Sequence, residues 1–236
     1  MNHYDNPEFF SAYAQMTRSQ QGLDGAGEWH QLQPLFPDPA GKDVLDLGCG
    51  YGWHCKYAAD HGAKRVLGID QSKMMIAEAK KRNTHEKIDY QICSLQDYDY
   101  PAASFDLVVS NLVLHYVKDL DAIYRRIYKT LRIGGVFLIN IEHPTFTAGV
   151  NQQFSDDGTW QVDNYYYPGE RQTSFLGHTI TKYHHTLTQI LGGLLKAGFR
   201  LEAVEEAMPP EEWRTIMPDE MRRPMMLLVK TVKDDG

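Results

Sequence analysis

The stretch VLDLGCGYG at positions 44–52, followed by GID at 68–70, decides how this chain folds. Its apolar start is typical of a buried strand, and the glycines after it allow a turn in which a ligand can lie against bare backbone. A helix that begins after such a turn aims its free N–H groups at that ligand. Asp70 lies twenty positions after Gly50, the spacing at which a Rossmann-like fold places an acid on ribose hydroxyls. The stretch therefore predicts a nucleoside-containing cofactor.

The whole chain has the composition of an ordinary globular protein. It has 236 residues, of which 42% are hydrophobic and 23% charged, and a formal net charge of −7. An acidic chain without a Lys/Arg cluster is a poor candidate for binding a phosphate backbone, so we expect no nucleic-acid partner. The first residues lack the features of a signal peptide, and no apolar run approaches membrane-spanning length. We therefore expect no membrane partner. The three cysteines lack zinc-ligand spacing, so we expect no metal site, and their number and placement suit a reducing cytoplasm.

Strands and helices alternate along the central part of the chain. Strands are predicted near residues 43–47, 65–70, 88–93, 105–110 and 135–142, and helices near 53–61, 72–82 and 119–130. This alternation predicts an α/β fold, a Rossmann-like three-layer sandwich with a mostly parallel sheet and helices on both faces. A further helix is predicted at 183–197, followed by two strands near 199–206 and 224–232.

The segments on either side of this core are predicted to cover it. Residues 6–35 look helical, with a break at the glycines of 22–27, and residues 143–178 form a long, weakly periodic stretch that is typical of a functional loop. We therefore expect residues 1–236 to form one domain. Its predicted parts are an N-terminal helical lid at 1–40, a cofactor-binding core at 41–142, a substrate-lid insertion after the fifth strand at 143–182, and a C-terminal helix and hairpin at 183–236.

Asp46 narrows the kind of cofactor. A dinucleotide-binding loop would read Gly-x-Gly-x-x-Gly, but here the glycines stand at 48, 50 and 52 and Trp53 takes the third dinucleotide position. A carboxylate two residues before the turn repels a pyrophosphate and favours a ligand with ammonium and sulfonium charges. S-adenosylmethionine carries both charges.

With these residues the chain resembles the class I S-adenosylmethionine-dependent methyltransferases, in particular the small-molecule, type 11-like group. The matching segments are 44–52, 68–70, SFDLVVS at 104–110 and LRIGG at 131–135, which lie in order within residues 40–142. The resemblance implies a seven-stranded sheet whose last two strands form an antiparallel hairpin. It also implies S-adenosyl-L-methionine as cofactor and S-adenosyl-L-homocysteine as product.

The same resemblance implies which residues hold the cofactor. Asp46 would lie near the methionine ammonium, and Gly48 and Gly50 would pass beneath the cofactor. Asp70, which Gln71 follows, would hold the ribose hydroxyls. Each residue also has a purely structural interpretation, in which the acids cap a turn or a helix and the glycines serve only a tight turn. That interpretation does not explain the joint spacing of the segments.

The remaining cofactor contacts are expected from turns after two further strands. The turn after the fourth strand would offer the backbone oxygen of Asn111, beside Leu112, to the ammonium. Where many family members carry an Asp for the adenine amino group, this chain has Ser94, which can accept only a weaker bond. The backbone of Leu95 and the side chains at 96 and 97 are therefore further candidates for the adenine end.

Histidines are the candidates for taking a proton from the methyl acceptor. His143 directly follows the fifth strand, and ligands of open α/β sheets bind outside the carboxyl ends of the strands. His184 and His185 begin the predicted helix after the insertion, where one of them could face the pocket while the other points away. His115, one helical turn beyond Asn111, is a further candidate. The alternative for each is a hydrogen-bonded core histidine.

The sequence thus predicts an enzyme that transfers a methyl group to O or N of a small molecule. The Asn-Pro-Pro-Tyr signature of amino-group methylation on nucleic acid or glutamine is absent after the fourth strand. One alternative is a catalytically silent or regulatory S-adenosylmethionine-binding protein. Another is an NAD(P)-dependent oxidoreductase, whose pyrophosphate would have to tolerate Asp46 and Trp53. We expect a monomer or a homodimer.

Overall fold

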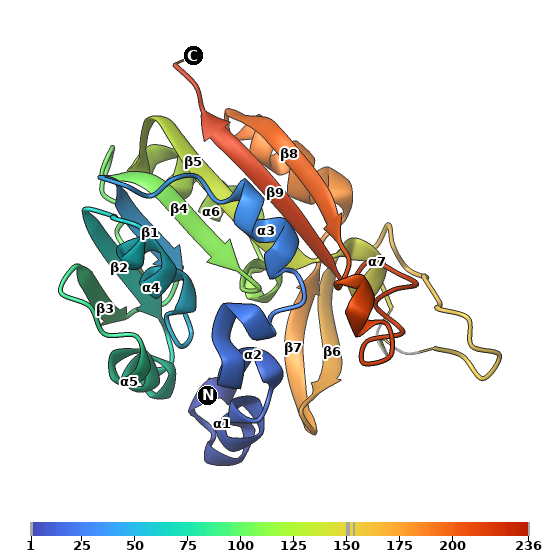
Figure 1. The fold of residues 1–236 in the computed structure, drawn as a ribbon. Helices are drawn as coiled ribbons and strands as arrows, with labels where there is room; N and C mark the ends of the chain where they lie inside the picture. The colour runs from blue at the N-terminus through green and yellow to red at the C-terminus, as the bar shows by residue number, and fades with distance from the viewer. Residues whose placement is uncertain (1, 150–151, 153, 236) are drawn as a thin grey trace.

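A seven-stranded sheet forms the centre of the protein (Figure 1), in the order β3-β2-β1-β4-β5-β9-β8. The computed structural model describes residues 2–149, 152 and 154–235. The strands of this sheet are β1 (Asp43–Leu47), β2 (Arg65–Asp70), β3 (Ile88–Ile92), β4 (Phe105–Asn111), β5 (Leu131–Glu142), β8 (Phe199–Ala207) and β9 (Met226–Lys233). Strands β1 to β5 pair in parallel, and β9 runs antiparallel to both β5 and β8. The predicted α/β fold with an antiparallel C-terminal hairpin is confirmed.

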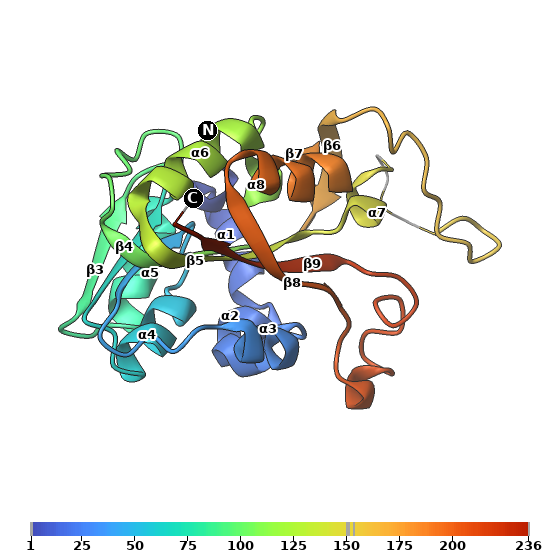
Figure 2. The same cartoon turned by 90° about the horizontal axis from the view of Figure 1, so that it is seen from above.

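Helices cover both faces of this sheet, as the view from above shows (Figure 2). One face carries α3 (Trp29–Leu35), α4 (Trp53–Asp60) and α5 (Lys73–Arg82), and the other carries α6 (Leu120–Thr130) and α8 (Gly193–Lys196). All five residues of β1 are buried, as expected for a central parallel strand that is covered on both faces. The strand order reverses between β1 and β4, so the carboxyl ends of these two strands border the crevice in which such folds bind ligands.

The N-terminal segment lies across the carboxyl ends of the strands. It consists of α1 (Pro7–Ala14) and α2 (Thr17–Gln21), and Asn6 caps α1 with its side chain. The Asp5 carboxylate accepts hydrogen bonds from Ser72 Oγ at 2.7 Å and from the backbone N–H of Met74 at 3.1 Å. These bonds fix the start of the chain to the first turn of α5, next to the end of β2. The short 3₁₀ turns of the fold are His3–Asp5, Gly22–Gly25, Leu114–Tyr116 and Glu211–Trp213.

A separate two-stranded hairpin stands beside the N-terminal helices (Figure 1). It consists of β6 (Gly169–Phe175) and β7 (His178–His184), and it follows the short helix α7 (Pro144–Thr147). Leu176 and Gly177 join the strands with positive φ angles of 52° and 78°, as in the tight turns that match strand twist. The turn touches α1, because the Phe9 ring lies 5.8 Å from the ring of Phe175.

The predicted helix at 183–197 is wrong at its N-terminal half. His184 ends β7, and helical structure begins only with the π turn Thr188–Gly192 that precedes α8. Residues 179–182 read TITK, a run of three β-branched residues followed by a lysine, and they pair with residues 171–174 of β6. This pairing extends the strand to His184. Among the helices in the part of the chain that the structure describes, none is long and apolar enough to cross a membrane.

Candidate active site

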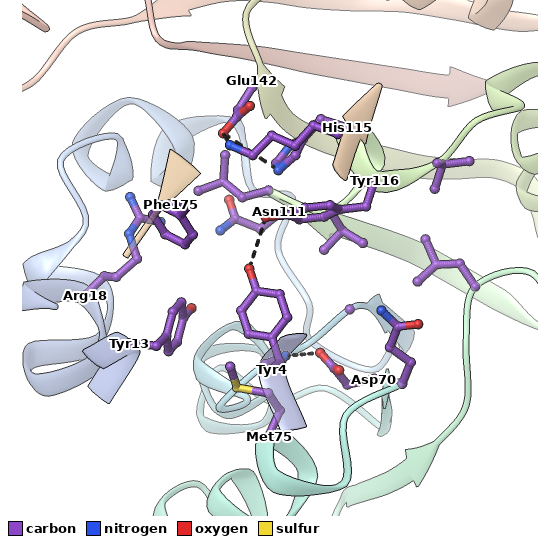
Figure 3. A pocket seen from close by; sticks show the side chains of 18 of the residues that line it. Tyr4, Tyr13, Arg18, Asp70, Met75, Asn111, His115, Tyr116, Glu142 and Phe175 are labelled. Atoms are coloured by element: carbon purple, nitrogen blue, oxygen red, sulfur yellow. Dashed lines mark hydrogen bonds and ion pairs between the residues drawn. The ribbon is translucent and has the colours of Figure 1, made fainter. Parts of the chain in front are cut away.

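A cavity of about 230 Å³ lies at the carboxyl ends of the parallel strands (Figure 3). One wall is formed by the glycine loop after β1 and by the ends of β2, β4 and β5. The N-terminal segment contributes Tyr4, Tyr13 and Arg18, and the hairpin contributes Phe175 and Lys182. Two segments that are far apart in the sequence therefore close over a site that the sheet presents.

The glycine loop leaves bare backbone at this cavity. Gly48 has a φ of +71°, and a Cβ there would come within 2.4 Å of a methyl group of Val113. Gly50 has a φ of +52°, and a Cβ there would meet nothing within 4 Å. Any other residue at position 48 would therefore be strained, and any other residue at position 50 would place a side chain in open space that a ligand can occupy.

Asp70 is held in place by two backbone N–H groups. The N–H of Gly50 donates to one carboxylate oxygen at 3.0 Å, and the N–H of Ser72 donates to the other at 2.8 Å. Burial raises the pKa of Asp70 to about 6, although both hydrogen bonds act in the opposite direction. The carboxylate lies at the cavity wall next to the glycine loop.

The structure brings seven of the nine predicted cofactor residues to the cavity wall. They are Gly48, Gly50, Asp70, Gln71, Leu95, Asn111 and Leu112. Asp46 and Ser94 are not among the lining residues. Asp46 is buried behind the loop, where it accepts a hydrogen bond from Cys55 Sγ at 3.2 Å, and burial raises its pKa to about 7. Ser94 instead donates its hydroxyl to the Asp97 carboxylate at 2.7 Å.

Arg18 is a lining residue that the sequence did not single out. It lines the main cavity and also an adjoining one of about 80 Å³ beside the glycine loop. Both of its terminal nitrogens donate to the Glu28 carboxylate, at 3.1 and 3.0 Å. The Asn140 amide N–H₂ donates to both Glu28 and Asn111, at 3.2 and 2.9 Å. This network joins α2 to the ends of β4 and β5. Its members are far apart in the sequence, so no local sequence pattern predicts it.

His143 does not line the cavity, contrary to the sequence prediction. Successive residues of a strand point to opposite faces, so Glu142 points inward and His143 outward. The Nδ1 atom of His143 accepts a hydrogen bond from the backbone N–H of Thr145 at 3.1 Å, which caps α7. Its Nε2 atom lies 2.9 Å from a carboxylate oxygen of Glu206 on β8. His143 therefore has structural contacts on both ring nitrogens.

His184 and His185 also lie outside the cavity lining. His184 ends β7 and His185 directly follows it, so neither residue begins a helix. The two ring nitrogens of His184 contact Thr147 Oγ1 at 2.8 Å and the backbone oxygen of Tyr165 at 2.9 Å. His185 Nε2 lies 2.8 Å from the backbone oxygen of Val117. Both histidines therefore make structural contacts of the kind that the alternative interpretation described.

The structure brings a different cluster into the cavity: His115, Glu142 and Lys182. Glu142 ends β5, and its Oε1 atom lies 2.5 Å from the ammonium nitrogen of Lys182, which reaches it from β7. His115 Nε2 lies 3.8 Å from the same oxygen. All three residues are buried, and burial lowers the pKa of His115 to about 4 despite the nearby carboxylate. His115 is therefore neutral at neutral pH.

Two tyrosine hydroxyls meet between this cluster and Asp70. Tyr4 OH lies 3.2 Å from Tyr116 OH, and both rings line the cavity (Figure 3). Burial raises the pKa of Tyr4 well above its usual value, with the hydroxyls of Tyr116 and Tyr13 contributing. Both hydroxyls therefore stay protonated and can donate hydrogen bonds. Among the described residues, no group of three or more His, Cys, Asp or Glu side chains is placed to hold a metal ion.

The fold and the cavity together define a Rossmann-like protein with a nucleoside-type crevice, and comparisons with known proteins identify its family. A family model described as a methyltransferase domain matches residues 45–139. The crystal structure of a Listeria monocytogenes protein, provisionally described as an S-adenosylmethionine-dependent methyltransferase, is similar at 43% identity and a TM-score of 0.85, covering 91% of this chain and 100% of that one.

Two further relatives support the same assignment. An S-adenosylmethionine-dependent methyltransferase from Mesorhizobium loti is 38% identical with a TM-score of 0.83, covering 89% of this chain and all of that one. The N-demethylindolmycin N-methyltransferase of Streptomyces griseus is 28% identical over 196 residues, which are 79% of each chain. This chain therefore belongs to the class I S-adenosylmethionine-dependent methyltransferases, and it is an enzyme that uses S-adenosylmethionine.

The lining residues fit this cofactor. The open space at Gly50 lets its aliphatic and ribose parts lie against the loop, and the Asp70 carboxylate can accept two hydroxyl hydrogen bonds. Arg18 offers a guanidinium beside the loop, where a carboxylate such as that of methionine can be paired. The lining residues are therefore compatible with the cofactor that the comparisons assign, whereas His143, His184 and His185 do not lie at the cavity wall.

Proposed function

We propose that this methyltransferase transfers the methyl group to O or N of a small molecule that binds inside the cavity. The observation that carries the proposal is the cover over the site. The Phe9 ring on α1 packs against Phe175 and His178 at the hairpin turn, at ring distances of 5.8 and 5.5 Å. An acceptor must fit under this cover, which suits a small molecule better than the side chain of a folded macromolecule.

The cofactor is proposed to be held by the seven lining residues and by Arg18. The backbone of Gly48 and Gly50 would support it, Asp70 would accept from the ribose hydroxyls, and Arg18 would pair with its carboxylate. Gln71 and Leu95 would border the adenine. Asn111 and Leu112 would offer backbone atoms to the ammonium, since Leu112 has a φ of 56° that turns the chain at the end of β4. Asp46 would not contact the cofactor directly, because it is buried behind the glycine loop.

The proposed proton acceptor is His115 rather than His143, His184 or His185. Bound S-adenosylmethionine supplies a methyl group that its sulfonium has already activated. The protein must then align the acceptor, exclude water and take up a proton. His115 is neutral and lies in the cavity, and the nearby Glu142 carboxylate would stabilise the imidazolium that forms. The Tyr4 and Tyr116 hydroxyls would position the acceptor as hydrogen-bond donors.

Binding and turnover measurements test this proposal. Calorimetry should show S-adenosylmethionine binding, and Asp70→Ala should weaken it by about 1.5–3 kcal/mol, the value of hydrogen bonds to a charged group. Asp157→Ala, at an exposed carboxylate outside the cavity lining, should leave it unchanged.

A fractionated cell extract then tests the acceptor class. S-adenosylhomocysteine should form when the protein and cofactor are mixed with the low-mass ultrafiltrate of an extract. Formation only with the macromolecular fraction would contradict a small-molecule acceptor. Absence of cofactor binding would contradict the proposed use of the cavity altogether.

A further inference from the structure

Arg18 presents an unused edge of its guanidinium at the wall that the N-terminal segment forms (Figure 3). Its two terminal nitrogens, Nη1 and Nη2, donate to the two carboxylate oxygens of Glu28 at 3.1 and 3.0 Å. This pairing occupies the end of the planar group, whereas Nε–H and the second hydrogen of Nη2 lie along its side edge. The Nε atom donates to none of the residues that the structure describes, and it keeps accessible surface. The side edge is therefore free to donate to both oxygens of a carboxylate.

The adjoining cavity of about 80 Å³ gives such a carboxylate a place beside the glycine loop. It shares part of its wall with the main cavity, namely Tyr13, Arg18, Gly48, Gly50 and Asn111. Arg18 is the one cationic side chain among the described residues that line it, since burial lowers the pKa of His54 to about 4. None of these lining residues is acidic. A ligand that lies along the glycine loop can therefore extend an anionic end into this cavity.

Glu28, in contrast, has no capacity left for a ligand. It is buried, and it stands outside the lining of both cavities. Besides the two bonds from Arg18, its Oε1 atom accepts a third from the Asn140 amide at 3.2 Å. An ionised carboxylate donates no hydrogen bond, so Glu28 acts on a ligand only through the guanidinium that it holds. Because a free Arg side chain has many rotamers, a buried bidentate partner removes that freedom before the ligand arrives.

Asn140 connects Glu28 to the other side of the same site. Its amide nitrogen donates to Glu28 Oε1 and to the side-chain oxygen of Asn111, at 3.2 and 2.9 Å. Asn111 ends β4, lines both cavities and lies opposite Asn140 in the register of β4 and β5. One buried amide thus fixes the guanidinium of Arg18 relative to the turn at Asn111. A site for an amino-acid group needs this, because its carboxylate and its ammonium are attached to the same carbon atom.

We propose that Glu28 is a positioning residue that makes the site selective for ligands with a free amino-acid group, because it holds the side edge of Arg18 ready for their carboxylate. The proposal rests on the function proposed above and names the residue on which its carboxylate contact depends. The Arg18–Glu28 pair is neutral as a unit, and a zwitterionic amino-acid group is neutral as well. Binding therefore leaves no unbalanced charge in the site. Arg18 lies on α2 and Glu28 directly precedes α3, so the N-terminal segment recognises this end of the cofactor.

Three ligands that differ only at this end test the proposal. They are S-adenosylhomocysteine, its decarboxylated analogue S-adenosyl-3-thiopropylamine, and 5′-methylthioadenosine, which lacks the whole amino-acid chain. Calorimetry measures the dissociation constant of each ligand for the purified protein. With the wild type, loss of the carboxylate should weaken binding about 10- to 100-fold, since hydrogen bonds to a charged group are lost. The ratio of the dissociation constants with and without the carboxylate is the selectivity that the variants are expected to change.

Three variants link this selectivity to Glu28 and Arg18. Glu28→Gln should weaken S-adenosylhomocysteine binding about 10-fold and leave the dissociation constant of 5′-methylthioadenosine within about twofold of the wild-type value. Arg18→Lys keeps a cation for Glu28 but lacks the planar side edge, so it should lower the selectivity by about threefold or more. The double variant Arg18→Met with Glu28→Gln leaves no charge buried alone, and in it loss of the carboxylate should cost less than about threefold. Glu8→Gln, at an exposed glutamate of α1 outside the lining, is the matched control.

The outcomes separate this proposal from the preceding one. Wild-type protein that binds none of the three ligands would overturn the proposed function. Equal weakening of all three ligands by Glu28→Gln would show that Glu28 supports only the fold, which would overturn its positioning role and leave the proposed function intact. Wild-type binding that is indifferent to the carboxylate would have the same consequence. Where Glu28→Gln does not fold, wild-type selectivity in Arg18→Lys and in the double variant would overturn the positioning role instead.

Discussion

At the scale of single residues, His143 is expected to contribute to the stability of the fold and not to the reaction. His143 caps α7 through Nδ1 and contacts Glu206 through Nε2, so His143→Gln should lower the free energy of unfolding by about 1–2 kcal/mol. It should leave kcat and cofactor affinity unchanged, because the residue lies outside the cavity lining. Urea unfolding and steady-state kinetics on one preparation check both parts. A lowered kcat at unchanged stability would show that His143 takes part in the reaction.

Asp46 predicts a pH dependence of stability. Its pKa is raised to about 7 by burial, so the folded state holds the proton more tightly than the unfolded chain, whose Asp pKa is about 3.9. This contribution to stability is present below pH 4 and is lost as the pH rises through 7. Asp46→Asn cannot ionise, so from pH 5 to 7 wild-type stability should fall relative to the variant by roughly 1.4 kcal/mol per pH unit.

Denaturant unfolding at pH 5 and pH 8 measures that difference. Asp60→Asn, at the exposed end of α4, is the control and should follow the wild type at both pH values. Parallel pH dependences for wild type and Asp46→Asn would show that the Asp46 carboxyl is not buried in its protonated form.

Some residues of the site could be predicted from the sequence and others could not. The spacing of Gly48, Gly50 and Asp70 fixed their places because a strand, a turn and a helix leave little freedom between them. The histidines were different, since the position of His143 at a strand end did not say which way its side chain points. Lys182 carries no local signal at all, because its contact with Glu142 depends on how the hairpin packs.

At the scale of elements, the contact between α1 and the hairpin predicts how the site opens. Phe9 is fully buried between Phe175 and His178. Phe9→Ala should therefore loosen the cover, and we expect faster dissociation of S-adenosylmethionine in stopped-flow measurements together with a lower melting temperature. Phe10→Ala is the matched control, because the Phe10 ring contacts Tyr51 rather than the hairpin. Equal dissociation rates for the two variants would argue against a cover that must open.

The hairpin is also the element that the sequence analysis missed. Its signal was present in residues 169–184, where two runs of strand-forming residues flank Leu176 and Gly177. The aromatic and polar residues before it obscure the alternation, so the sequence pattern places the histidines at 184 and 185 in the helix that follows. Strands β1 and β4 of the central sheet were easier to predict, because most of their residues are buried on both faces and they appear as nearly continuous apolar runs.

At the scale of the whole molecule, the site joins the N-terminal segment and the hairpin to the central sheet. Arg18 reaches Asn111 through Glu28 and Asn140, and Asp5 caps the first turn of α5 beside Asp70. The hairpin reaches the end of β5 through Lys182 and Glu142. A ligand that fills the cavity therefore touches elements that do not otherwise form a continuous core, so its binding free energy should hold them together.

Hydrogen exchange measures this coupling directly. At 100 times the dissociation constant, S-adenosylmethionine should stabilise the protein by about 2.7 kcal/mol, and the gain should appear as slower exchange in residues 4–18 and 169–184 as well as in the glycine loop. The strand pair β8 and β9, whose amides pair with each other away from most of the cavity wall, reports the gain in global stability with which the local slowing is compared. Protection confined to the glycine loop and Asp70 would show that the N-terminal segment and the hairpin do not respond to the cofactor. Protection of 4–18 without 169–184 would show that the hairpin responds only to the methyl acceptor, because Lys182 and Phe175 line the end of the cavity away from Asp70.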